Sequence, residues 1–165
     1  MASRFDRRAF LAAAFAAPAA SASQIAARKA PPFETKTLIG RRIRLEDYKG
    51  KTLLLVFWAT WCPHCRRYLS AMQQLYKEYA ARNIEMLALS VDETGWKVVA
   101  PYIRDHSLTV PIALAPAAAQ RAYDTSGGIP ITSIIDGEGN QIRRFVGGPN
   151  TEQLRGLLEA MMKKA

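Results

Sequence analysis

Both cysteines of the chain, Cys62 and Cys65, lie in one short segment, WATWCPHCRR at residues 58–67. Four kinds of chemistry use cysteines at this spacing: thiol–disulfide exchange, metal binding, haem attachment and a structural disulfide. Haem attachment is excluded, because it needs a histidine directly after the second cysteine, where this chain has Arg66. A structural bond across so short a loop contributes only about 2 kcal/mol, so stability alone explains the pair poorly.

Metal binding stays open on the residues alone, since Cys62, Cys65 and His64 are all metal ligands. A structural zinc site needs a second pair of cysteines or histidines, and the only other histidine is His106, which we expect at the surface. We therefore expect no metal and no organic cofactor. The redox-active group is then the Cys62–Cys65 disulfide itself.

The neighbouring residues favour Cys62 as the reactive sulfur. Pro63 suits the first position of a helix, because the N–H that it lacks has no partner there, and this makes Cys62 the capping residue. Free backbone N–H groups and the positive end of the helix stabilise a thiolate, which lowers a cysteine pKa from about 8.5 to between about 3.5 and 7.5. Cys65, one turn into the helix and less exposed, is the expected resolving thiol.

A strand and a helix are expected to position this pair. Residues 53–57 are a continuous apolar run, typical of a strand buried on both faces, and helical periodicity begins at the cysteines. The other expected elements are a hairpin around Gly40, strands at 84–91 and 110–114, helices at 98–106 and 117–123, strands at 132–135 and 141–146, and a last helix capped by Asn150 with Gln153. Pro101 fits only the first turn of its helix. This alternation predicts an α/β fold with a mixed sheet covered on both faces.

The stretch LLLVFWATWCPHC resembles the strand and active-site turn of the thioredoxin superfamily. The further stretches LEDYKGK, ALSVDE and GGIPITSIIDGEGNQIRRFVGG are similar to the TlpA-like exported thiol–disulfide oxidoreductases of the redoxin group, and the likeness covers about residues 33–162. It implies a thioredoxin-like fold with an N-terminal β-hairpin. It also implies an enzyme that exchanges disulfides with protein partners.

The resemblance also assigns residues around the disulfide. It implies that Pro130 is preceded by a cis peptide bond and lies beside the sulfurs. Ile129 then offers its backbone to an extended substrate segment, which adds a strand next to the disulfide. Trp61 is expected to pack against the turn and to shape the docking surface.

The direction of electron flow stays open, with a lean toward oxidation. His64, through donation to the Cys62 sulfur, and Arg66 and Arg67, through positive potential, favour the thiolate and so make the disulfide a better oxidant. Relatives carry proton-shuttling acids where this chain has Val56 and Tyr68, which weakens the case for a fast reductase. The TlpA-like scaffold itself implies a reductant of exported partners, such as apocytochrome c.

The N-terminus predicts export. Residues 1–22 combine three arginines, a nine-residue apolar run and a small-residue cleavage site, and DRRAFL resembles the twin-arginine signature. The apolar run is too short for a stable membrane span. We expect residues 23–32 to be a linker, residues 33–165 to be the thioredoxin-like domain, and the mature protein to be periplasmic.

The net charge narrows the partners. The chain carries +9, and three arginines against Asp6 give the signal +2, so +7 remains after cleavage. This balance is typical of a generally solvated basic face; the alternatives are acidic partners or an anionic membrane surface, and nucleic acid is not expected outside the cytoplasm. Two rivals to the oxidoreductase are a copper-handling thiol module and a peroxiredoxin. The peroxiredoxin pattern Pro-x-x-x-Thr-x-x-Cys is absent from FWATWCPHC.

Overall fold

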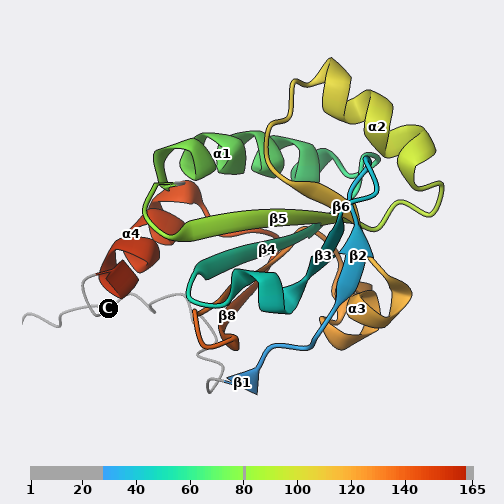
Figure 1. Ribbon diagram of the computed structural model, residues 1–165. Helices are drawn as coiled ribbons and strands as arrows, with labels where there is room; N and C mark the ends of the chain where they lie inside the picture. The colour runs from blue at the N-terminus through green and yellow to red at the C-terminus, as the bar shows by residue number, and fades with distance from the viewer. Residues whose placement is uncertain (1–27, 80, 163–165) are drawn as a thin grey trace, which may run out of the picture.

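A six-stranded sheet in the order β1-β8-β7-β4-β5-β6 forms the body of the protein, and β2-β3 forms a separate two-stranded sheet (Figure 1). The computed structural model describes residues 28–79 and 81–162. The strands are β1 Arg28–Lys29, β2 Glu34–Lys36, β3 Arg42–Arg44, β4 Thr52–Trp58, β5 Ile84–Ser90, β6 Ile112–Leu114, β7 Ile131–Ile135 and β8 Asn140–Val146. The helices are α1 Pro63–Tyr79, α2 Trp96–Asp105, α3 Ala117–Ala122 and α4 Thr151–Met162, with 3-10 turns η1 Leu45–Tyr48 and η2 Thr125–Gly127.

Strand β4 is the centre of the sheet. It pairs in parallel with β5 and antiparallel with β7, so Val56 faces Ala88 on one side and Thr132 on the other. From Leu53 to Trp58 the strand is completely buried, as the continuous apolar run predicts. The mixed α/β sheet expected from the sequence is confirmed.

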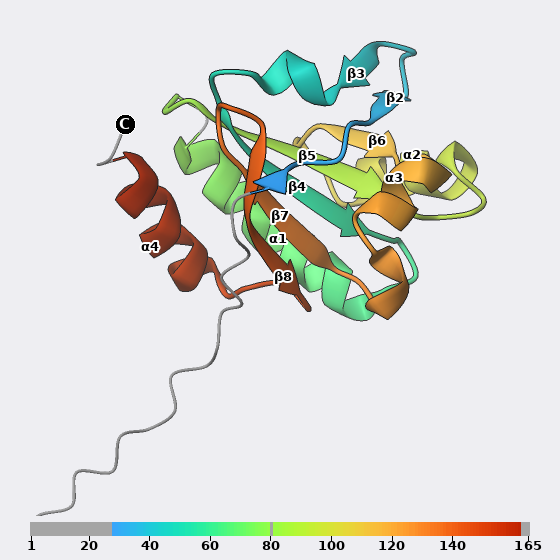
Figure 2. The ribbon, with the colours of Figure 1, turned by 90° about the horizontal axis from the view of Figure 1, so that it is seen from below.

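The two faces of β4 support two cores. Leu54, Val56 and Trp58 pack in a cluster with residues of α1, α2 and α4, whereas Leu53, Leu55 and Phe57 pack with the β2–β3 hairpin and α3. Figure 2 shows the hairpin and α1 on opposite sides of the sheet. Burying each large apolar side chain stabilises the fold by about 1.5–3 kcal/mol. Helices cover both faces, as expected.

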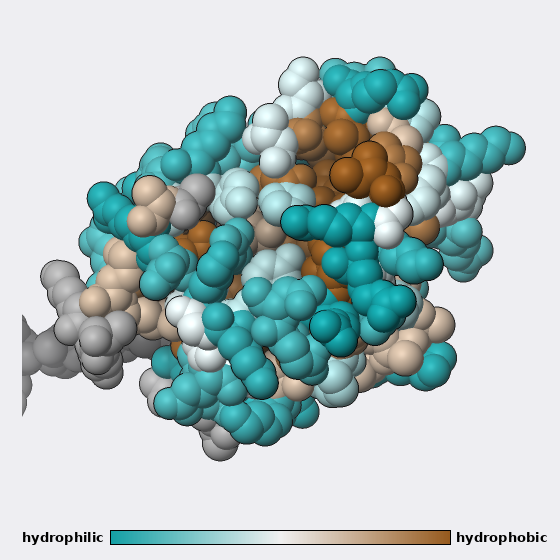
Figure 3. Space-filling model, in the orientation of Figure 1, coloured by the Kyte–Doolittle hydropathy of each residue, from teal (hydrophilic) through white to brown (hydrophobic). Residues whose placement is uncertain are grey.

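The expected N-terminal hairpin is also confirmed. Strands β2 and β3 pair antiparallel, with Thr35 opposite Ile43. Gly40 has a φ of 80°, which glycine adopts without strain, and its N–H donates to the carbonyl oxygen of Thr37 across 2.9 Å. Part of the apolar surface at the upper right of Figure 3 lies where Figure 1 has the tip of this hairpin.

Several boundaries differ from the sequence-based expectations by one or two residues, such as strand β6, which begins at Ile112 rather than at residue 110, and two of the differences need a physical account. Strand β1 lies inside the expected linker 23–32, because the Arg28 guanidinium donates to Gln141 across 3.2 Å and the chain pairs with β8. Helix α2 begins at Trp96 rather than at residue 98, so Pro101 is its sixth residue and not in its first turn. The helix accepts the proline at the loss of one backbone hydrogen bond.

The predicted signal, residues 1–22, lies outside the described residues. Among the helices of the described part, none has the length and apolarity needed to cross a bilayer.

Candidate active site

The cysteine pair lies where β4 gives way to α1. Strand β4 ends at Trp58, a short turn follows, and α1 begins at Pro63. The N–H of Cys65 donates to Sγ of Cys62 across 3.1 Å, and the N–H of Arg66 donates to the Cys62 carbonyl oxygen across 3.1 Å. Cys62 is thus the capping residue of α1, as predicted from the proline after it.

The two sulfurs are joined in a disulfide, with Cα atoms 5.2 Å apart. Cys65 is completely buried, whereas Cys62 is 6% exposed. Cys62 also lines a groove of about 870 Å³. An incoming sulfur therefore reaches Cys62 and is blocked from Cys65, which is the asymmetry expected from the sequence.

The peptide bond between Ile129 and Pro130 is cis. The Ile129 carbonyl oxygen lies 3.7 Å from Sγ of Cys62, and Pro130 itself is buried. The structure therefore brings together the cysteines and the Ile-Pro pair from a segment more than sixty residues later. Trp61 is 66% exposed and forms part of the groove wall, so it contributes to the surface around Cys62 more than to packing under it.

A buried carboxylate holds the turn before Cys62. Asp92 lies just after β5 and accepts hydrogen bonds from Thr60 N–H at 2.9 Å, Thr60 Oγ1 at 2.6 Å and Ser90 Oγ at 2.7 Å. Asp92 is only 8% exposed, and Ser90 is buried beside it. The carboxylate therefore ties the end of β5 to the turn that leads into the cysteines. Sequence reasoning missed this role, although an acid just after a buried strand was visible.

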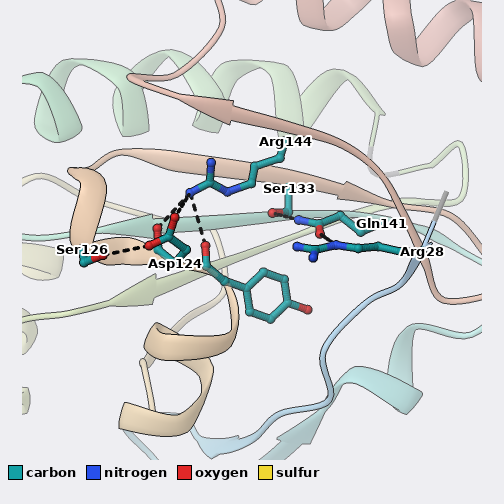
Figure 4. Close-up of polar contacts among 7 residues, drawn as sticks. Arg28, Asp124, Ser126, Ser133, Gln141 and Arg144 are labelled. Atoms are coloured by element: carbon teal, nitrogen blue, oxygen red, sulfur yellow. Dashed lines mark hydrogen bonds and ion pairs between the residues drawn. The ribbon is translucent and has the colours of Figure 1, made fainter. Parts of the chain in front are cut away.

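The opposite wall of the groove is held by Arg144 of β8. Its guanidinium donates to the carbonyl oxygen of Asp124 at 2.8 Å and of Tyr123 at 3.4 Å, and lies 3.6 Å from the Asp124 carboxylate (Figure 4). Asp124 has a φ of 52°, a left-handed conformation that is uncommon outside glycine. Ser126 Oγ donates to the same carboxylate across 2.8 Å. These contacts fix α3 and η2 beside Ile129, and no local motif in the sequence pointed to them.

Positive charge surrounds the start of α1, but His64 does not contact Cys62. His64, Arg66 and Arg67 are all exposed. The His64 ring lies 3.5 Å from the Arg67 guanidinium, and within the described residues this is its one side-chain hydrogen-bond contact. The expected donation from His64 to the Cys62 sulfur is therefore not found in this disulfide form, because the exposed ring turns along the helix surface.

Val56 and Tyr68 occupy the two positions at which the family resemblance implies an acid. Val56 is fully buried in β4. Tyr68 packs on the other side of the site, and its hydroxyl shares a hydrogen bond of 2.8 Å with Thr132 Oγ1. Burial raises the pKa of Tyr68 to about 12, so the phenol stays protonated at neutral pH. A Cβ on Gly148 would lie 2.9 Å from the Tyr68 ring, so glycine is needed at this contact.

His106 is exposed and stacks on Tyr102, with ring centroids 3.9 Å apart. No cluster of three or more His, Cys, Asp or Glu side chains with metal-binding geometry occurs in residues 28–79 and 81–162. The surface position predicted for His106 is confirmed.

Comparisons with known proteins agree with this geometry. A family model described as the AhpC/TSA family matches residues 26–143. Thiol-disulfide oxidoreductase ResA of Bacillus cereus is 33% identical over 132 residues, which cover 80% of this chain and 76% of that protein. Thioredoxin-like protein YneN of Bacillus subtilis (strain 168) is 38% identical over 114 residues, covering 68% of this chain and 66% of that protein.

A solved structure leads to the same family. The crystal structure of a thiol:disulfide interchange protein of the thioredoxin family from Chlorobium tepidum TLS has a TM-score of 0.73 and 27% identity, and the match covers 85% of this chain and 99% of that one. The thioredoxin-like fold and the Cys62–Cys65 disulfide at the N-terminus of α1 both agree with a redox enzyme. The chain belongs to the AhpC/TSA family, as a TlpA-like member with a thioredoxin-like fold, and is a thiol–disulfide oxidoreductase.

Proposed function

We propose that this oxidoreductase exchanges disulfides with exported protein partners in the periplasm, through a mixed disulfide on Cys62 that Cys65 resolves. The observation that carries the proposal is the hydrogen bond of 3.1 Å from Cys65 N–H to Sγ of Cys62. A backbone donor at a helix start stabilises negative charge on that sulfur, which favours Cys62 both as attacking thiolate and as leaving group.

In the oxidising direction, a partner thiolate attacks Sγ of Cys62. A new S–S bond forms, and the Cys62–Cys65 bond breaks with its electron pair on Sγ of Cys65. A second partner thiolate then attacks the partner sulfur of the mixed disulfide, and Cys62 leaves as the thiolate. The partner gains a disulfide, and the protein takes up two electrons. The reducing direction is the reverse sequence, in which Cys62 attacks a partner disulfide and Cys65 releases the reduced partner.

The groove supports a protein substrate. Half-buried Ile129, which precedes Pro130, lines the groove beside the disulfide, and its backbone suits an extended segment that adds a short strand there. Trp61 offers apolar contact area on the other side of Cys62. In this assignment Ile129, Pro130 and Trp61 bind the partner, whereas Pro63 and His64 tune the reactivity of the cysteines.

The direction depends on the reduction potential. Exposed His64, Arg66 and Arg67 make the surroundings of Cys62 electropositive, which stabilises the reduced form. The absence of an acid at Val56 and Tyr68 removes a proton shuttle for Cys65. Both features support oxidation, with a potential above the value of about −270 mV found for thioredoxin.

Export is supported by the pattern of residues 1–22. It is also supported by the Cys62–Cys65 disulfide, because disulfides form and persist in oxidising compartments such as the periplasm. A fusion of residues 1–22 to a reporter that functions only outside the cytoplasm tests it. The twin-arginine route is tested in the full chain. Replacement of Arg7 and Arg8 by Lys is expected to abolish export, whereas the control replacement of Arg41 and Arg42 by Lys is expected to leave export unchanged.

Trapping of the mixed disulfide tests the exchange. The Cys65→Ser protein, mixed with a disulfide-containing protein such as insulin, is expected to form a covalent adduct on a non-reducing gel. The matched Cys62→Ser protein is expected to form none, because Cys65 is buried. Equal adducts in both variants contradict the assignment. Tight stoichiometric copper binding without any turnover in the unaltered protein favours the copper-handling alternative instead.

A further inference from the structure

The tip of the β2–β3 hairpin carries two adjacent exposed aliphatic side chains. Ile39 is 87% exposed and Leu38 is 51% exposed. In the described part of the chain, only Trp61 and Val146 join them as exposed large hydrophobic residues. Trp61 belongs to the groove beside Cys62, so it is explained by the redox site. The aliphatic pair at the hairpin tip is not explained by that site or by any core.

Cations flank this aliphatic pair on both strands. Lys36 precedes it, Arg41 and Arg42 follow it, and all three are exposed. The segment of residues 36–42, KTLIGRR, has three positive charges and no acid. Its one ion pair with a described residue joins Arg42 to Glu34 across 3.3 Å, and both side chains are well exposed, so solvent screens it strongly. The hairpin tip is therefore both apolar and basic.

The base of the hairpin is fixed while its tip projects. Ile43 is buried in the core, Thr35 Oγ1 donates to the Leu114 carbonyl oxygen across 2.7 Å, and Thr37 forms a bridge to Ala113. The turn is closed by a hydrogen bond of 2.9 Å from Thr37 N–H to the Arg41 carbonyl oxygen. Because the turn is held in this way, Leu38 and Ile39 remain presented to the outside.

We propose that the hairpin tip, residues 36–42, docks on an anionic membrane surface. Leu38 and Ile39 enter the boundary between headgroups and acyl chains, while Lys36, Arg41 and Arg42 lie among anionic headgroups. Apolar insertion combined with cations that face the headgroups is the physical basis of peripheral membrane binding. This assignment goes beyond the thiol chemistry and requires neither cysteine.

A lipid surface fits this tip better than an acidic protein does. A stable protein interface buries about 800 Å² on each partner, and two aliphatic side chains on a narrow projection offer little of that area. A bilayer accepts a projecting tip without a shaped pocket. Lys36, Arg41 and Arg42 belong to the positive charge of residues 23–165, and the redox site does not use these three cations.

Docking through the hairpin leaves the start of α1 accessible. The hairpin packs on one face of the sheet and α1 on the other (Figure 2). The membrane-bound enzyme therefore keeps Cys62 open to partners in solution.

Vesicle partitioning of the full chain tests the proposal. We expect binding to phosphatidylcholine vesicles that contain about a third phosphatidylglycerol, and weaker binding to phosphatidylcholine alone. The double variant Leu38→Ser/Ile39→Ser and the triple variant Lys36→Gln/Arg41→Gln/Arg42→Gln are each expected to lower the partition coefficient about tenfold or more.

Two matched controls keep the test specific. Val146→Ser removes an exposed aliphatic side chain elsewhere, and Lys77→Gln/Lys97→Gln/Arg104→Gln removes the same charge from other exposed positions. Both are expected to change partitioning less than about twofold. After reduction of their Cys62–Cys65 pairs with a dithiol, all variants are expected to react with a small disulfide at the rate of the unaltered protein, which separates this proposal from the redox function.

Hydrogen exchange localises the contact. Vesicles are expected to slow amide exchange within residues 36–42 of the full chain. The proposal is overturned if exchange there is unchanged while the chain binds vesicles, or if the hairpin variants partition like the unaltered protein. It is also overturned if the hairpin charges are needed only for binding to polyglutamate, which indicates an acidic protein partner.

Discussion

The backbone amide of Cys65 donates a hydrogen bond to Sγ of Cys62 across 3.1 Å, so the buried cysteine stabilises the accessible one through its backbone as well as through the disulfide. This relationship exists because Pro63 begins the helix and leaves Cys62 as its cap. The turn before it is held by Asp92, and the groove beside it is held by Arg144. Each of these supports can be removed separately.

Asp92→Asn is expected to destabilise the protein by about 1–3 kcal/mol. Both oxygens of the Asp92 carboxylate accept hydrogen bonds from Thr60 or Ser90. In the Asp92→Asn variant an NH₂ group replaces one oxygen, so at least one of these donors loses its acceptor. Urea unfolding of the oxidised protein measures the loss. The control is Glu93→Gln, the next residue, which is exposed and is expected to change stability by less than about 0.5 kcal/mol. Equal stability of the two variants contradicts a structural role for Asp92.

Arg144→Gln is expected to lower kcat/KM for a protein substrate roughly tenfold, the scale of one lost charge-assisted interaction of about 1.4 kcal/mol. Without the guanidinium, the left-handed Asp124 and the η2 turn lose the contacts that fix them beside the groove. The rate with a small disulfide should stay the same, because Cys62 is untouched. Arg143→Gln is the control, since that side chain donates only to the carbonyl of its neighbour Ile142 within the described residues. If Arg144→Gln lowers the rate with the small disulfide as much as it lowers kcat/KM for the protein substrate, Arg144 has no role specific to the groove.

Tyr68→Phe is expected to cost about 1–2 kcal/mol at neutral pH, because Thr132 Oγ1 loses its partner in a buried position. The pH dependence has a definite sign. The pKa of Tyr68 is raised to about 12 by burial, against about 10 in the unfolded chain, so its contribution is present below pH 10 and is lost as the pH rises toward 12.

Alkaline urea titrations measure this dependence. The gap in stability between the unaltered protein and Tyr68→Phe should shrink above about pH 10. The control for the lost hydrogen bond, at neutral pH, is Tyr102→Phe, which removes a hydroxyl without a hydrogen-bond partner in the described residues. A gap that grows with alkaline pH contradicts the assigned cause of the pKa shift.

His64→Pro is expected to lower the reduction potential by about 30 mV, the equivalent of about 1.4 kcal/mol for two electrons. The variant removes the exposed imidazole, which lies beside the Arg67 guanidinium, and also the backbone N–H of residue 64 at the helix start. We expect both losses to weaken the stabilisation of the Cys62 thiolate. Equilibration with a glutathione redox buffer measures the potential. His106→Gln, the other exposed histidine, should leave it unchanged. An unchanged or higher potential in His64→Pro contradicts a tuning role for residue 64.

Local sequence patterns predicted the parts of the site that depend on local physics. The apolar run of β4, the proline after Cys62 and the pairing of Asn150 with Gln153 each act over a few residues, and the cap at Gln153 N–H forms at 2.7 Å. The approach of Ile129 to Cys62 came from the family resemblance, because spacing alone does not bring distant segments together.

The supports of the site were invisible for the same reason. Asp92 acts on Thr60 and Arg144 acts on Asp124, across 32 and 20 positions of the chain. A single charged residue in a sequence does not reveal which distant donor or carbonyl it meets. The two exposed aliphatic residues at the hairpin tip were likewise hidden, since Leu38 and Ile39 look like ordinary strand residues until the turn is placed.

The thiol titration of Cys62 tests the central claim most directly. The reduced Cys65→Ser protein has a single thiol, and thiolate absorbance against pH gives its pKa. The helix start and the Cys65 amide predict a pKa below about 7.5. A Cys62 pKa near about 8.5, the value of a free cysteine, contradicts the account.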